Sequence, residues 1–138
     1  MERAYNFQLN TAELDITDYT RNYYLTRLFN SLSILFPLGE RKFMESIRHY
    51  EKELTPALLV EAKLFYKEEA QHSMQHKKLN DELKASGYDI DSLELSIKRK
   101  LSVLGRNPEA SIMITVALEI FTAYGADLLI AIDPIIFK

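Results

Sequence analysis

The chain has no cysteine and no tryptophan, and its four glycines and four prolines leave few breaks along 138 residues. The absence of cysteine excludes a disulfide framework and a thiolate metal site, so any metal must be bound by nitrogen and oxygen. Because 47% of the residues are apolar, a chain of this length can bury a core without cross-links. We expect a polar N-terminal arm at 1–18 and a single helical domain at 19–138.

An excess of positive charge is also missing. The formal net charge is −3, and the basic residues are scattered among acidic ones. Neither nucleic acid nor an anionic membrane surface is therefore an expected partner. Residues 1–10 are charged early and lack the apolar run of a secretory signal, which predicts a cytoplasmic protein.

The few glycines and prolines lie where helices should begin or end, and the segments between them have helical spacing of apolar residues. Pro37 predicts the end of a first helix, because proline cannot donate the backbone hydrogen bond of a helix interior. Thr55 and Asn107, each followed by proline, have the signature of helix N-caps, and Gly87 that of a C-terminal cap. The predicted helices are 19–36, 37–54, 56–87, 91–105 (capped by Asp89 or Asp91) and 108–131 (closed by Asp133-Pro134). The fold class is all-α.

The last predicted helix is apolar on nearly every side, which is typical either of a membrane span or of a helix buried in a bundle. Glu119 and Asp127 interrupt the apolar run. We therefore interpret it as a buried bundle helix and expect no membrane insertion.

The buried stripe of the long central helix contains ionisable residues in its middle and apolar residues at its ends. A carboxylate and two imidazoles on such a stripe each cost several kcal/mol unless a partner or a cation compensates them. Glu69 and His72 form a Glu-x-x-His pair on one helix face, and His76 lies one turn further on. A metal ion is the direct explanation, and a metal-free hydrogen-bonded pair is the alternative. The stripe is Leu58, Ala62, Phe65, Glu69, His72, His76, Leu79 and Leu83.

Other residues could complete the site. Glu40 is the charged residue on the apolar stripe of the predicted helix 37–54. The first turn after Pro37 would favour a carboxylate in any case, because a helix N-terminus attracts negative charge. Glu119 is flanked by apolar residues, where an unpaired glutamate is rare. His76 could be a ligand, a group that orients a ligand, or a satisfied core histidine. His49 lies off its stripe and is interpreted as solvated.

The spacing of the glutamates supports a common site. Glu40 lies fourteen residues before Leu54, and Glu69 lies fourteen residues after Thr55, so a hairpin that turns there sets both at one height. If the segment 87–106 crosses back along the bundle, the last helix runs parallel to the long one. Glu119 then lies at the same level as the other two glutamates. Ferritin-like bundles with one long crossover have this arrangement.

Three segments in order resemble the motifs of one known family, the bacterial "predicted metal-dependent hydrolase" family of the ferritin-like superfamily. The resemblance covers about residues 29–129. The resemblance implies a helical metal-binding protein with ligands expected at Glu40, Glu69, His72, His76 and Glu119. The matching segments are Phe36-Pro37-Leu38-Gly39-Glu40, then Glu68-Glu69-Ala70-Gln71-His72 with His76 and Asn80, then Ala117-Leu118-Glu119-Ile120-Phe121-Thr122-Ala123.

The chain departs from that family at its end. Family members continue into a further helix with Trp-His and Glu-Glu-x-x-His motifs, whereas this sequence ends at Lys138 and has only one Glu-x-x-His. We expect an incomplete ferritin-like bundle, which is a fragment, naturally short or completed by a partner. Because an uncovered apolar helix would be costly, self-association as a homodimer is expected.

Two classes of function follow from these residues. The first is a metal-dependent enzyme, either a hydrolase or a di-iron oxidase or oxygenase acting on an unidentified small molecule, with iron expected and manganese or zinc possible. The second is a non-catalytic helical module for metal binding or self-association. Neither the substrate nor the catalytic residues can be predicted from the sequence.

Overall fold

The computed structural model describes residues 15–104 and 106–137, and these form four long helices. Within this part of the chain there is no strand; a single bridge pairs Thr20 with Phe137. The all-α prediction is confirmed. The helices are α1 (Tyr23–His49), α2 (Pro56–Ala85), α3 (Ile90–Leu104) and α4 (Pro108–Ile136), with a short 3-10 turn, η2 (Glu51–Glu53), between α1 and α2.

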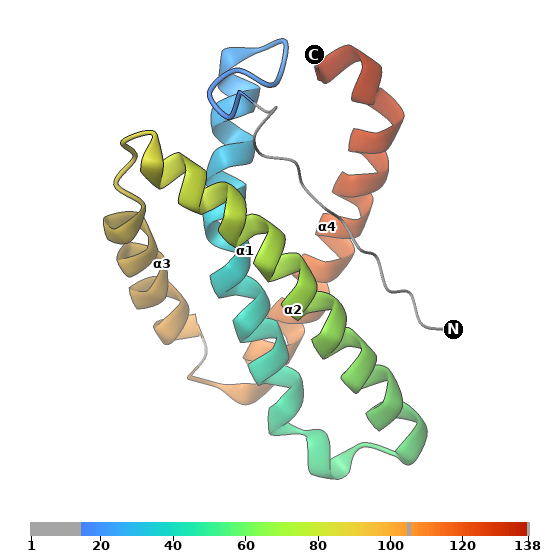
Figure 1. Ribbon diagram of the computed structural model, residues 1–138. Helices are drawn as coiled ribbons and strands as arrows, with labels where there is room; N and C mark the ends of the chain where they lie inside the picture. The colour runs from blue at the N-terminus through green and yellow to red at the C-terminus, as the bar shows by residue number, and fades with distance from the viewer. Residues whose placement is uncertain (1–14, 105, 138) are drawn as a thin grey trace.

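Helix α1 is the centre of the bundle and packs against each of the other three helices. Figure 1 shows α2 folding back along α1, α3 lying on one side of α1 and α4 on the other. Helix α3 returns the chain to the end where α2 began, so α2 and α4 run in the same general direction. The crossover that would bring Glu119 level with Glu69 is therefore present.

The prediction that Pro37 separates two helices is wrong, because α1 continues through it from Tyr23 to His49. Pro37 has no N–H to donate to the carbonyl four residues earlier, which belongs to Ser33. The Asn80 amide supplies the missing donor, with Nδ2 lying 3.0 Å from the Ser33 carbonyl oxygen. A side chain of α2 thus satisfies the backbone group that the proline leaves free in α1.

This compensation predicts a coupling between Asn80 and Pro37. Asn80→Ala should lower the free energy of unfolding by about 1–3 kcal/mol, because it leaves the buried Ser33 carbonyl unsatisfied. In a Pro37→Ala background the loss should be smaller, because the restored backbone N–H can serve that carbonyl. Urea unfolding of the two single variants and the double variant measures this coupling. Equal losses in both backgrounds would contradict the proposed compensation.

Helix α1 begins at Tyr23, after an Asn22 cap, and not at 19 as predicted, whereas the starts of α2, α3 and α4 have the predicted caps. Thr55 Oγ1 accepts a hydrogen bond from the Leu58 N–H (3.3 Å), and Asn107 Oδ1 accepts one from the Ala110 N–H (3.0 Å). Asp89 Oδ1 accepts from the Ser92 N–H at 3.1 Å, at the start of α3. Gly87 follows α2 with φ of 92°, which glycine adopts without the steric cost that a Cβ would bring.

Helix α4 ends later than predicted. It passes Asp133-Pro134 and continues to Ile136. Its last turn is tied to the start of the described chain, since the Arg21 N–H donates to the Ile136 carbonyl at 2.7 Å. The Phe137 ring stacks with those of Tyr19 and Phe29. These tertiary contacts stabilise a turn that proline alone would have ended.

The main hydrophobic core lies between α1, α2 and α3. It contains Ile34, Leu83 and Ile90, together with Ile16 from the segment before α1. Residues 1–14 of the predicted polar arm lie outside the described residues. Helix α4 contributes little to this core.

The expectation that α4 is a buried bundle helix is wrong for this chain. Of its described residues only Thr115 is buried, while Phe121, Tyr124 and Ile130 are each about three-quarters exposed (74–75%). By length and composition α4 is also able to cross a membrane, although core helices pass the same test. The apolar side chains of α4 stay exposed because, among the described residues, no helix covers the side of α4 that faces away from α1.

Candidate metal centre

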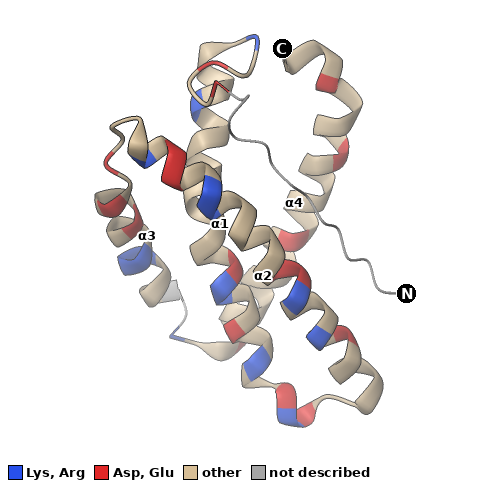
Figure 2. Ribbon diagram, in the orientation of Figure 1, with Lys and Arg blue, Asp and Glu red and all other residues tan. Residues whose placement is uncertain are grey.

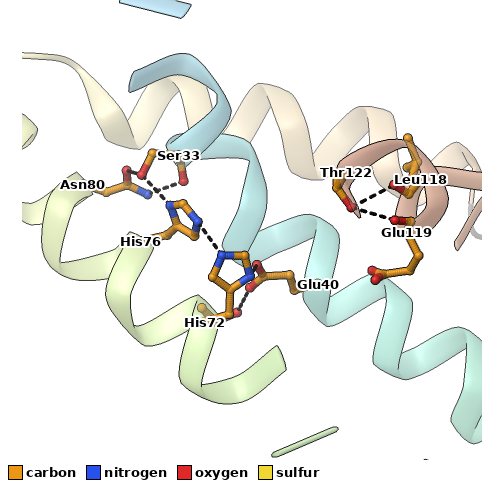
Figure 3. A network of polar contacts seen from close by, with 9 residues as sticks. Ser33, Glu40, His72, His76, Asn80, Leu118, Glu119 and Thr122 are labelled. Carbon is orange, nitrogen blue, oxygen red and sulfur yellow. Dashed lines mark hydrogen bonds and ion pairs between the residues drawn. The ribbon is translucent and has the colours of Figure 1, made fainter. Parts of the chain in front are cut away.

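Three of the predicted ligands lie together at the middle of the α1–α2 interface. Glu40 of α1 and His72 and His76 of α2 each offer one ligand atom, and these atoms all lie within 4.8 Å of one another. His72 Nδ1 lies 2.7 Å from Glu40 Oε1, and His72 Nε2 lies 3.0 Å from His76 Nε2. Figure 3 shows the two imidazoles following each other along α2 with the Glu40 carboxylate beside His72.

The hydrogen bonds around His76 fix which ring nitrogen carries its proton. Asn80 Nδ2 donates to the Ser33 carbonyl, so the Asn80 Oδ1 atom is the acceptor of the Ser33 hydroxyl proton at 2.9 Å. Ser33 Oγ can then only accept from His76 Nδ1, which lies 3.0 Å away. Because burial lowers the pKa of His76 to about 4, the ring is neutral at pH 7 and its Nε2 carries a lone pair.

The separation of the two Nε2 atoms is compatible with one ion between them. Two nitrogens that lie about 2.1 Å from an ion, at right angles around it, are about 3.0 Å apart. In the metal-free protein a proton on His72 Nε2 can occupy the same gap, because contact with the Glu40 carboxylate raises the pKa of His72. The pair can therefore exchange a shared proton for a cation.

Glu40 is a buried carboxylate, exposed to only 2%. Its Oε2 accepts a hydrogen bond from Ser73 Oγ. Among the described residues, none donates a well-directed hydrogen bond to Oε1, whose contact is the ion pair with His72. A buried carboxylate oxygen with an unused lone pair beside two imidazoles fits a divalent cation.

Glu69 and Glu119 belong to the same electrostatic cluster. Burial, together with the charges of Glu119 and Glu40, raises the pKa of Glu69 to about 7. Burial and the charge of Glu40 likewise raise the pKa of Glu119. In Figure 3 the Glu119 carboxylate of α4 points toward the side of α1 that carries Glu40. The charge of Glu40 thus acts on both of the other carboxylates, an arrangement that a cation would relieve.

These shifts predict how the stability of the metal-free protein depends on pH. The pKa of Glu69 is raised from 4.5 to about 7 and that of His72 is also raised, so their contributions are lost as pH rises. The pKa of His76 is lowered from 6.5 to about 4, so its contribution is lost only as pH falls below 6.5. Between pH 6.5 and 8, stability should therefore decrease, by about 1 kcal/mol after allowance for solvent screening.

Urea unfolding with a chelator present, at several pH values between 6.5 and 8, measures this decrease. Glu69→Gln should flatten the profile and make the protein more stable at pH 8, whereas Glu61→Gln, an exposed change on the same helix, should leave the profile unchanged. A wild-type protein that becomes more stable over this range would contradict the assignment.

Sequence reasoning placed His72 on a buried stripe, but its side chain is 54% exposed. Leu58, at the start of that stripe, is also 54% exposed. The described residues leave this side of α2 open, and the candidate centre is consequently accessible to solvent. His49 is exposed, as predicted.

Ser33 and Ser73 were not predicted, although both contact the cluster. Ser33 lies seven residues before Glu40 on the same face of α1, and Ser73 lies four residues after Glu69 on α2. Helical spacing therefore places both on the correct faces. Their small polar side chains are common on helices, and so they gave no separate signal.

The comparisons with known proteins identify a family for this chain. No curated protein and no solved structure matches the chain. A family model described as predicted metal-dependent hydrolase matches residues 1–136, beyond both ends of the segment in which the motifs were recognised. The chain belongs to this predicted metal-dependent hydrolase family.

Proposed function

We propose that this protein is a metal-dependent hydrolase whose ion is bound by Glu40, His72 and His76. The observation that carries the proposal is the convergence of these three side chains, with one ligand atom from each within 4.8 Å of the others. The family description supports the same chemistry. Glu69 and Glu119 would complete the ligand set or act beside it.

Each side chain has a role that follows from its contacts. His76 presents the Nε2 lone pair because Ser33 and Asn80 fix its tautomer. Glu40 presents a buried oxygen that can bind the ion directly or, through Nδ1, hold His72 in place. A bound divalent ion would supply a Lewis acid and lower the pKa of water.

Glu69 is suited to be the general base. Its pKa of about 7 lies near a working pH, where it can accept a proton from water and later release it. Its carboxylate is buried and belongs to the same cluster as Glu40 and Glu119. It can therefore act on a water molecule held at the centre of that cluster.

Metal analysis of the purified protein tests the proposal. Iron is the metal we expect, with manganese and zinc as the other ions that suit nitrogen and oxygen donors. The protein should lose its metal to a chelator, and hydrolysis of a simple ester or amide should return when metal is added back. A protein that takes up none of the three ions would overturn the proposal and leave a non-catalytic helical module.

A second candidate is a two-iron centre that activates oxygen, as in ferritin-like proteins. The electrostatic effect of Glu40 on both Glu69 and Glu119 favours it, because three carboxylates exceed what one ion requires. Two irons per chain with an oxygen-dependent absorbance would favour the oxidase. One ion per chain with metal-dependent hydrolysis would favour the hydrolase.

A further inference from the structure

A cavity of about 650 Å³ lies at the opposite end of the α1–α2 interface from the main core. Residues of α1, α2 and the first turns of α4 line it, together with Leu54 from the connection after α1. Its lining is mainly apolar, and its volume is typical of a small-molecule site. The apolar side chains of the lining are Ile47, Leu54, Leu58, Ala62, Leu64, Phe65 and Ile112.

Part of the cavity lining shares one face of each of three helices with the candidate metal centre. Ile47 follows Glu40 by seven residues on α1, and Ile112 precedes Glu119 by seven on α4. Phe65 precedes Glu69 by four on α2. Residues spaced by four or seven share one helix face, so the floor of the cavity lies about 6–10 Å along the helices from the three carboxylates.

The charges around the cavity restrict its ligand. Glu61 and Glu68 line it with a single basic residue, Lys67, and the three carboxylates of the metal cluster lie beyond its inner end. Figure 2 shows acidic residues on all three helices near this end, basic residues on α1 and α2 as well, and no basic residue on α4. An anionic ligand such as a phosphate or a free carboxylate would be repelled by these charges, whereas an uncharged chain would not.

We propose that this cavity binds the apolar chain of an uncharged substrate whose amide or ester group lies at the metal centre. The inference rests on the proposed hydrolase function and adds the substrate class. The apolar lining provides affinity for an alkyl or aryl chain, and the distance to Glu69 leaves room for a polar group at its inner end.

Octanamide is a suitable probe, and octanoate is its charged counterpart of nearly equal size. With a chelator present, octanamide should bind saturably with a Kd of about 1 mM, the affinity that about ten heavy atoms provide at ordinary ligand efficiency. Amide shifts in NMR spectra should map to Ala62, Phe65 and Ile112. Octanoate should bind at least tenfold more weakly.

A matched pair of variants tests the location. Leu58→Trp fills the mouth of the cavity and should weaken octanamide binding at least tenfold, while Leu95→Trp on α3 should not change it. Leu58 and Leu95 have similar exposure (54% and 50%), so both variants should keep the fold, which circular dichroism checks. Ile112→Trp, from the opposite wall, should act like Leu58→Trp.

The outcomes separate this inference from the proposed function. Metal uptake without octanamide binding, or octanoate binding as tightly as octanamide, would overturn the substrate class and leave the metal centre intact. Octanamide binding that Leu58→Trp and Ile112→Trp both leave unchanged would place the ligand elsewhere and would also overturn it. Localised octanamide binding in a protein that takes up no metal would refute the hydrolase and retain the binding site.

Discussion

His72→Ala should abolish metal binding, lowering the affinity at least about 100-fold. His72 lies between the other two members of the group, 2.7 Å from Glu40 and 3.0 Å from His76, so its loss separates them. Glu69→Ala should have the same effect if Glu69 is a ligand, because it removes a carboxylate from the cluster. Metal content after dialysis against one equivalent of iron measures both effects.

Helix content should hardly change in either variant. His72 is more than half exposed, and removing the Glu69 carboxylate relieves a desolvation cost even as a ligand is lost. His49→Ala is the control, since His49 is an exposed histidine that lies outside the cluster, and its metal content should equal that of the wild type. Wild-type metal content in both His72→Ala and Glu69→Ala would refute the proposed centre.

The roles of His76 and Glu40 can then be assigned by comparing the metal affinities of their variants with that of His72→Ala. A residue that binds the ion directly should cost as much affinity as His72, while a residue that only orients a ligand should cost about 10–100-fold. His76→Ala tests the three alternatives that the sequence left open, because a satisfied core histidine would lower stability without lowering metal affinity. Glu40→Gln applies the same comparison to Glu40.

The local features of the fold could be predicted from sequence because their causes are local. Thr55 and Asn107 cap helices through side chains that reach backbone N–H groups three residues away. The two helix ends that were wrong, at Pro37 and Pro134, depend on distant residues. Asn80 satisfies the carbonyl that Pro37 leaves free, and Arg21 binds the last turn beyond Pro134.

The candidate site likewise has some features with local causes and others that depend on distant residues. Helical periodicity and equal distances from the hairpin turn predicted that Glu40 and the Glu69–His72 pair share one site, and Glu40 does lie beside His72. The exposure of His72 was missed, because it depends on which neighbouring helix covers that side of α2. The tautomer of His76 was beyond prediction as well, since it follows from contacts between Ser33 and Asn80, 47 residues apart.

The outer face of α4 should hold two copies of the chain together. Residues spaced by four and three form a continuous apolar stripe along it, and all of them are exposed. Steps of four and three keep residues on one helix face, as in helices that pair with each other. The stripe consists of Met113, Ala117, Ile120, Tyr124, Leu128, Ala131 and Ile135. Burying its larger side chains is worth about 1.5–3 kcal/mol each, before the cost of association.

A second copy fits this stripe better than a membrane does. Helix α4 has no lysine or arginine to meet anionic lipid, as Figure 2 shows. Its inner face is fixed to α1, since Ser46 Oγ lies 2.9 Å from Thr115 Oγ1 in a buried contact. Glu119 lies on that same inner face. Insertion of α4 into lipid would break these contacts, whereas pairing through the outer face preserves them.

Light scattering and analytical ultracentrifugation should therefore find a dimer at micromolar concentration. Tyr124→Glu should give a monomer, because a two-fold axis near the middle of the stripe would bring two buried carboxylates together without partners. Leu95→Glu, which also introduces a carboxylate at an exposed leucine but on α3, should leave the dimer intact. A monodisperse wild-type monomer at high micromolar concentration would refute the pairing. If that monomer also held two metals per chain, completion of the site by a second copy would be refuted with it.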